Sequence, residues 1–384
     1  MIVVYAKEPW PGSISKSIFL VGPTPRDKVK IKSWRPEALR ILEELGYDGI
    51  VFVPEDRNGK WEKGEYINQV EWEENCLNIA DCIVAWVPRD MATMPALTTN
   101  TEWGVWCDSG KIVFGAPPEA VAVTYQKYYA GKYKVPISTT LEDTLKSALA
   151  MIGEGAIRTG GECQVPLYIW RTPHFQNWYQ AQKQAGNRLD GAKVLWTWRV
   201  GPKKDIVFFF AIHVDVYIAS EGRNKTNEVV ISRPDISTVM MYKPDRDNIA
   251  NSDIVLIREF RSPAANCFVW ELPGGSSFRL GVDSLQLAAD ECLEETGLKI
   301  NPVRMRAHQS RQLIATLSSH QAHLFSVELT DEELAWLKSQ EGIVHGVIED
   351  SERTYIEVVK LGDILLFGRV DWSMLGMILS VLNS

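Results

Sequence analysis

The sequence predicts a two-domain α/β protein, with a doubly wound parallel sheet in the N-terminal half and an α/β/α sandwich with a mixed sheet in the C-terminal half. Three observations support this class. Short, continuously apolar runs alternate with helical patterns in the first half, the second half is rich in strands, and 384 residues suit two or three domains. We expect domains at 1–158 and 191–384, joined by a linker with a helix at 159–190.

Four β-branched and aromatic runs are the expected strands of the first sheet. Their unbroken apolar character is typical of strands that are buried on both faces of a parallel sheet. A proline follows each run closely, and proline cannot continue a β ladder, so each strand should end there. The runs are Ile18–Val21, Gly49–Val53, Cys82–Trp86 and Lys111–Phe114.

Helical patterns separate these runs, and this alternation predicts right-handed crossovers that cover both faces of the sheet. In such sheets the ligand cleft lies beyond the carboxyl ends of the strands, where the proline-bearing loops are. The expected helices are Arg35–Leu45, Tyr66–Ala80, Thr101–Gly110 and Leu141–Ile152.

Composition and charge exclude several classes of function. The net charge of −8 argues against non-specific binding to nucleic acid or to an anionic membrane. The six cysteines form no C-x-x-C pair, which favours reduced thiols in a cytoplasmic protein. The N-terminus lacks the features of a signal peptide, and the longest apolar run, Ile206–Ile212, is far shorter than the roughly 20 residues of a membrane helix.

One carboxylate, Glu102, follows the third expected strand and should lie near the cleft. Thr98, Thr99 or Asn100 can cap the helix that begins here, which would place Glu102 in its first turn. An isolated Thr-x-x-Glu is more often a capping box that only stabilises the helix. The neighbouring motifs favour a chemical role instead.

Residues 15–125 resemble the nucleoside 2-deoxyribosyltransferase family and its N-glycoside hydrolase relatives. Gly22-Pro23 matches the family's G-P after an early strand, and Glu102–Gly104 matches the element that carries its nucleophilic glutamate. The family also has an acidic residue on the preceding helix, for which Glu73 is the best match and Glu71 and Glu74 are the alternatives. The resemblance implies a flavodoxin-like sheet.

This resemblance implies N-glycosidic chemistry, with Glu102 as nucleophile and Glu73 as acid/base or sugar-hydroxyl contact. Breaking the bond generates an oxocarbenium-like sugar that a carboxylate can trap. Gly22, Pro23 and Asn100 would contact the substrate. Arg26 and Arg89 would hold a 5′-phosphate, although a solvated loop charge is the commoner role of such arginines. Two departures, Ala96 in place of an aspartate and Phe19 near a position that is tyrosine in some members, leave hydrolysis and transfer both open.

Three further carboxylates crowd one helical face in the second half. Glu291, Glu294 and Glu295 have spacings that bring their side chains together after the glycine pair of Glu271–Gly275. Such repulsion usually has a cation to neutralise it, and Mg²⁺ prefers oxygen ligands. The alternative is a solvated acidic face.

Residues 191–384 resemble the Nudix hydrolases, whose signature is G-x5-E-x7-R-E-U-x-E-E-x-G-U. The three glutamates and Gly297-Leu298 match, whereas Asp290 replaces the arginine, and Val282 or Asp283 stands at the first glutamate. The resemblance implies that Mg²⁺ or Mn²⁺ is bound by Glu291, Glu294 and Glu295, with Glu294 also catalytic. Arg258–Arg261 resembles an element of Nudix enzymes that act on ADP-ribose and nucleotide sugars.

The two resemblances together predict a bifunctional enzyme that processes small-molecule nucleosides or nucleotides, with no nucleic-acid or membrane partner. One domain would cleave or exchange an N-glycosidic bond, and the other would hydrolyse a diphosphate. The alternative is a glycosidase with a non-catalytic Nudix-like module for sensing or dimerisation, and a defence role that depletes nucleotides is also open. We expect a homo-oligomer.

Overall fold

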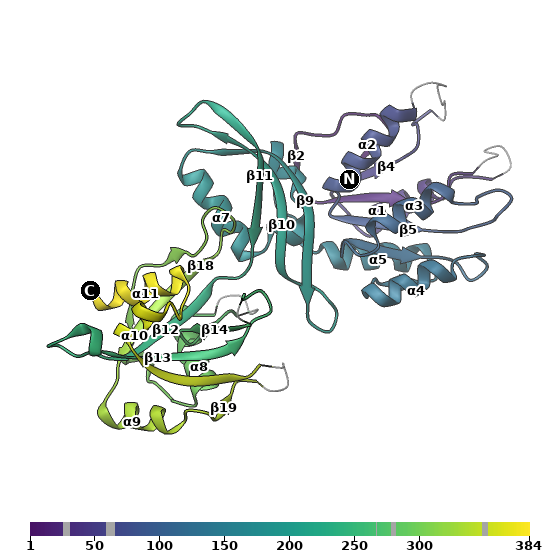
Figure 1. The fold of residues 1–384 in the computed structure, drawn as a ribbon. Coiled ribbons are helices and arrows are strands. Elements are labelled where there is room, and N and C mark those ends of the chain that lie inside the picture. The colour runs from purple at the N-terminus through teal and green to yellow at the C-terminus, as the bar shows by residue number, and fades with distance from the viewer. Residues whose placement is uncertain (26–30, 59–65, 266, 278–281, 348–351) are drawn as a thin grey trace. The chain divides into compact units, whose positions relative to one another are not determined.

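The computed structural model describes residues 1–25, 31–58, 66–265, 267–277, 282–347 and 352–384 (Figure 1). The chain forms two compact units, Met1–Ile231 and Ser232–Ser384. The boundary between them lies beyond the 190/191 boundary expected from the sequence. None of the helices in the described ranges is long and apolar enough to cross a bilayer.

The first unit contains a six-stranded parallel sheet with the strand order β1-β4-β3-β5-β6-β7. The expected parallel sheet is confirmed, and each of its four predicted strands lies within one residue of an observed one. Two further edge strands were not predicted. The strands are β1 (Ile2–Tyr5), β3 (Ser17–Val21), β4 (Ile50–Val53), β5 (Cys82–Trp86), β6 (Ile112–Gly115) and β7 (Ile137–Ser138).

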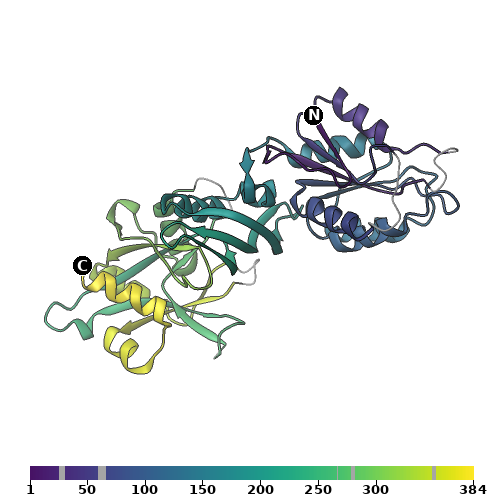
Figure 2. The ribbon, with the colours of Figure 1, turned by 90° about the horizontal axis from the view of Figure 1, so that it is seen from above.

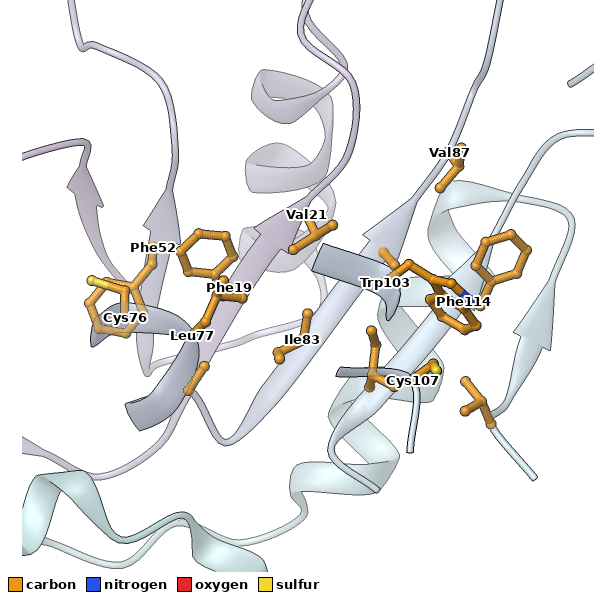
Figure 3. Close-up of a cluster of buried hydrophobic side chains, with 14 of the residues drawn as sticks. Phe19, Val21, Phe52, Cys76, Leu77, Ile83, Val87, Trp103, Cys107 and Phe114 are labelled. Atoms are coloured by element: carbon orange, nitrogen blue, oxygen red, sulfur yellow. The ribbon is translucent and has the colours of Figure 1, made fainter. Parts of the chain in front are cut away.

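Helices cover both faces of this sheet (Figure 2). Helices α1 (Arg35–Glu44) and α5 (Leu141–Ile152) bury their apolar residues against one face. Helices α2 (Tyr66–Ile79), α3 (Leu97–Trp106) and α4 (Thr124–Tyr133) pack on the other. The second core is drawn in Figure 3, where Phe19 and Phe52 from the sheet lie beside α2, and Phe114 lies beside Trp103 of α3.

Helix α3 begins earlier than predicted. Its N-cap is Ala96, which has a left-handed φ of 57° and makes no side-chain capping bond. The prediction that Thr98, Thr99 or Asn100 caps the helix is therefore wrong, because all three lie inside it. Glu102 is consequently beyond the first turn of α3, and it is not the acidic partner of a capping box.

A three-stranded antiparallel sheet completes the first unit. It packs on helix α7 (Pro173–Gln184) and the short helix α6 (Leu167–Trp170) through a separate apolar core around Phe175 and Phe210. The sheet follows a 3-10 turn, η1 (Gly160–Gln164), and a two-stranded ribbon of β2 (Ser13–Ile14) and β8 (Arg158–Thr159). Its strands are β9 (Arg188–Val200), β10 (Ile206–Ile218) and β11 (Arg223–Ser232), in the order β11-β10-β9.

The second unit contains the expected mixed sheet. Strand β12 pairs parallel with β18 and antiparallel with β13. Apolar residues of helices α8 and α9 form one core with the sheet, and those of α10 and α11 form another, so helices pack on both faces. The principal elements are β12 (Ile236–Lys243), β13 (Asp253–Phe260), β14 (Phe268–Glu271), β15 (Gly274–Gly275), α8 (Ser284–Thr296), β16 (Arg306–Ala307), β17 (Arg311–Gln312), β18 (Gln321–Glu328), α9 (Asp331–Ser339), β19 (Val344–His345), β20 (Thr354–Lys360), α10 (Leu361–Phe367) and α11 (Trp372–Leu382).

Candidate active site

The parallel sheet of the first unit changes direction between β3 and β5. Strands β3 and β5 are neighbours, and the chain winds outward from them to opposite edges. Ligands of doubly wound sheets bind beyond the carboxyl ends of the strands at such a switch point. The Gly22-Pro23 segment follows β3 at this end.

Gly22 and Pro23 are held by two side chains from the start of α1. Arg35 donates from Nη2 to the Gly22 carbonyl at 2.7 Å, and Trp34 donates from Nε1 to the Pro23 carbonyl at 3.2 Å. A Cβ on Gly22 would lie 2.3 Å from the Trp86 carbonyl oxygen, so only glycine fits here. The motif thus has a clear packing role at the strand end. Arg26 lies outside the described residues.

Arg35 is a residue of this region that the sequence analysis missed. Its side chain is 2% exposed and forms an ion pair with Glu55 at 2.6 Å, while Nε donates to the Leu20 carbonyl. Its positive charge acts on both Glu73 and Glu102, where it partly opposes the rise in pKa that burial causes. An arginine at the first position of a helix gives no sequence signal of burial.

A groove of about 640 Å³ runs between α2, α3 and β9, and both predicted carboxylates line it. Its volume lies within the range of sites that take small organic ligands. Glu73 and Glu102 come from facing helices, and both are partly buried. The structure therefore brings together the two residues that the sequence analysis selected for glycosidic chemistry.

The electrostatics of the pair favour a reactive carboxylate. Burial, together with the negative charge of Glu73, raises the pKa of Glu102 to about 7, although Arg35 acts in the opposite direction. Burial also raises the pKa of Glu73, against the effect of a 2.7 Å hydrogen bond that its Oε1 accepts from Gln69. A carboxyl group that titrates near neutrality can exchange a proton or act as a nucleophile at physiological pH.

Arg89 and Asn100 lie in an internal network. Arg89 is 6% exposed, donates to the Asn100 side chain and binds the Ala122 carbonyl at 2.6 Å. Gln126 of α4 donates to the same Asn100 oxygen at 2.7 Å. Neither Arg89 nor Asn100 lines the groove. Their evident role is to join the loop after β5 to α3 and α4, and their expected contact with substrate stays a prediction.

A buried ion pair fixes the opposite end of the sheet. Arg158 and Asp81 have fully buried side chains and form two parallel hydrogen bonds of 2.8 and 2.7 Å. Asp81 also accepts hydrogen bonds from the backbone of Ser17 and of Leu167, each at 2.8 Å. This pair ties the segment after α5 to the amino ends of β3 and β5, and the sequence analysis did not identify it.

The predicted metal ligands of the second unit all lie on α8 but differ in exposure. Glu295 is 1% exposed and accepts a 2.8 Å hydrogen bond from the Gly274 amide, Glu291 is partly buried against Gly275, and Glu294 is exposed. Burial and nearby carboxylates raise the pKa of Glu291 to about 7 and that of Glu295 well above its usual range.

The geometry of a formed metal centre is not seen around these glutamates. Across the described ranges of the chain, no group of three or more His, Cys, Asp or Glu side chains lies close enough together to hold a metal ion. Asp283, one of the two residues at the position of the first Nudix glutamate, is the N-cap of α8 and accepts from the Gln286 amide. The magnesium site therefore stays a prediction.

Comparison with known proteins supports the first resemblance. The model of a family described as nucleoside 2-deoxyribosyltransferase like matches residues 15–120. A search of curated proteins found no match. The matched segment includes β3, β4, β5 and β6, Gly22-Pro23 and both predicted carboxylates, Glu73 and Glu102. The match ends before the second unit, so the Nudix resemblance remains a prediction. The N-terminal parallel-sheet segment is thus similar to the nucleoside 2-deoxyribosyltransferase-like family.

Proposed function

We propose that the first unit cleaves or exchanges the N-glycosidic bond of a nucleoside, with Glu102 as the nucleophile. One observation carries this proposal: Glu102 and Glu73 line the same groove, within a segment similar to the deoxyribosyltransferase-like family. The raised pKa of Glu102 supports it, because part of the population is ionised and part is protonated near pH 7.

The reaction would proceed in two displacements. The ionised carboxylate of Glu102 attacks C1′ of the sugar, the C1′–N bond breaks, and its electron pair leaves with the base, which takes up a proton. The resulting glycosyl ester is then opened by water, giving the free sugar, or by a second base, giving a new nucleoside. Glu73 would contact a sugar hydroxyl or handle a proton, since one carboxylate attacks and a second group assists in this chemistry.

The test is product analysis on a panel of nucleosides and deoxynucleosides, with and without a second base. We expect release of the base with wild type and a loss of at least about a hundredfold with Glu102→Gln, which keeps the shape but cannot form the ester. Glu71, the alternative to Glu73 in the sequence, is exposed on α2 and does not line the groove, so Glu71→Gln is the matched control and should retain activity. Cleavage at an unchanged rate by Glu102→Gln would refute the assignment.

A second candidate function is hydrolysis of a diphosphate-linked nucleotide by the second unit with Mg²⁺ or Mn²⁺. The observation that favours it is the crowding of Glu291 and Glu295 beside the Gly274-Gly275 strand, where burial and then like charges raise both pKa values. These two side chains, with Glu294, would hold the ion, which would polarise the diphosphate and supply an activated water. Glu294 would also take the catalytic role that the resemblance assigns to it.

Calorimetric titration with Mn²⁺ tests the metal without a known substrate. We expect one site whose affinity falls at least about tenfold in Glu291→Gln, because that variant removes a charged ligand. Glu332→Gln, on an exposed turn of α9, is the control. Equal binding by wild type and Glu291→Gln would remove this candidate.

A further inference from the structure

Strand β9 forms one wall of the groove that holds Glu102, although it lies outside the segment that matches the family. It is an edge strand, since the order of its sheet is β11-β10-β9. Residues 193–197 of this strand line the groove. This wall of the groove therefore comes from a part of the chain that lies outside the family match.

Polar contacts fasten this wall on both sides of its midpoint. Lys193 forms a 3.2 Å ion pair with Glu74 of α2. Arg199 donates to the Ser109 and Gly110 carbonyls, just after α3, at 2.8 and 3.2 Å. Its guanidinium packs so closely that a Cβ on Gly110 would lie 2.0 Å from it. The stretch between the two anchors is thus held in place over the groove.

Large apolar side chains in this stretch are left uncovered. Leu195 and Trp196 are each 52% exposed and line the groove, as does Trp106 of α3. A half-exposed indole in a cavity that also holds a reactive carboxylate is a surface on which a flat aromatic ring can stack. Trp198 provides a comparison, because it is 54% exposed on the same strand and packs beside Trp196, with ring centroids 6.1 Å apart, but does not itself line the groove.

The charged residues that line the groove disfavour a ligand with a phosphate group. Four of the described lining residues are acidic: Glu73, Glu74, Glu102 and Asp108. The two lining lysines are already engaged, since Lys193 pairs with Glu74 and Lys111 donates to three backbone carbonyls at 2.7 to 2.9 Å. The described lining residues thus offer no unengaged cation to a phosphate, and the carboxylates repel one.

We propose that the groove binds an aromatic N-glycoside without phosphate, neutral or cationic, whose base stacks on Trp196. This inference rests on the proposed function of Glu102 and extends it to the class of substrate. Trp196 is a specificity-determining residue that contacts the base equally before and during bond cleavage. It therefore contributes to KM and not to kcat.

The experiment compares Trp196→Ala, Trp196→Phe and the control Trp198→Ala on whichever nucleoside the wild type cleaves, and on its 5′-monophosphate. We expect Trp196→Ala to raise KM about tenfold or more with kcat within about threefold, because stacking is lost. Trp196→Phe should recover most of the affinity, and Trp198→Ala should raise KM less than Trp196→Ala does, because it removes only a ring packed beside Trp196. The monophosphate should have a kcat/KM at least about tenfold below that of the nucleoside.

Equal KM values for Trp196→Ala and Trp198→Ala, or a monophosphate preferred over its nucleoside, would overturn the inference. A separate measurement distinguishes it from the proposed function. Binding of free adenine to Glu102→Gln is measured by isothermal titration calorimetry, with and without Trp196→Ala. Binding that is lost with Trp196 supports the aromatic site even where no nucleoside is cleaved, and binding unaffected by Trp196→Ala overturns it even where Glu102 proves catalytic.

Discussion

Replacing Glu102 by glutamine should stabilise the protein at alkaline pH and have little effect at acidic pH. The pKa of Glu102 rises from its ordinary 4.5 to about 7 on folding, so the folded state favours the protonated carboxyl. Wild type is therefore most stable below pH 4.5 with respect to this group, and it loses that stability as the pH rises through 7. Glutamine does not ionise and avoids the loss.

The magnitude follows from the two pKa values. Each pH unit between 4.5 and about 7 corresponds to about 1.4 kcal/mol in the free energy of unfolding. Ionisation of Glu102 therefore lowers the stability of wild type by about 3 kcal/mol at pH 8 and by less than about 1 kcal/mol at pH 5. In a unit that spans Met1–Ile231, about 3 kcal/mol corresponds to a rise in melting temperature on the order of 5–10 °C.

Thermal unfolding of the full chain followed by circular dichroism at pH 5 and pH 8 measures this difference, and it needs no substrate. Glu71→Gln, which removes an exposed charge from α2, is the control and should change the melting temperature by a degree or so at either pH. A Glu102→Gln variant that is no more stable than wild type at pH 8, or equally stabilised at both pH values, would refute the argument that this carboxyl is buried and destabilising when charged.

Three further predictions concern neighbouring charges. Glu73→Gln removes a negative charge that raises the pKa of Glu102, so that pKa should fall and the acidic limb of the kcat/KM profile should move to lower pH. An unmoved limb would show that the two carboxylates do not interact. Asp81→Asn leaves the Arg158 guanidinium buried without its counter-charge, and urea unfolding should show a loss of about 3–5 kcal/mol, partly restored by adding Arg158→Met. Lys111→Met leaves three carbonyls at the end of α2 without their donor, so hydrogen exchange there should accelerate and stability should fall by at least about 2 kcal/mol; unchanged protection would contradict this.

The sequence predicted the parallel sheet well because its strands are buried on both faces and have a strong, continuous apolar signal. The two strands that were not predicted are edge strands. The run Ile2–Tyr5 pairs only with β4, and Ile137–Ser138 is too short to form a pattern. Helix α4 was also missed, because its tyrosine- and lysine-rich sequence, TYQKYYAGKY, has almost no amphipathic periodicity.

The candidate site was predicted in part for a similar reason. Glu102 and Glu73 could be chosen because local motifs surround them, and the structure brings both to one groove. The other residues of the site come from distant positions in the chain, and no local sequence pattern identifies them. Arg35 acts through long-range charge, and Trp196 is one of many residues in a long strand whose partner in space is set by tertiary packing.

The attachment of β9 has a consequence for how reactivity and selectivity are distributed along the chain. Lys193 joins the strand to Glu74 within α2, and Arg199 joins it to the segment just after α3. A polypeptide that stopped before residue 188 would keep Glu73 and Glu102 but lose the side of the groove that β9 forms. In the proposed reaction, attack on the sugar and selection of the base would thus reside in separate stretches of the chain, and substitutions could alter one while sparing the other.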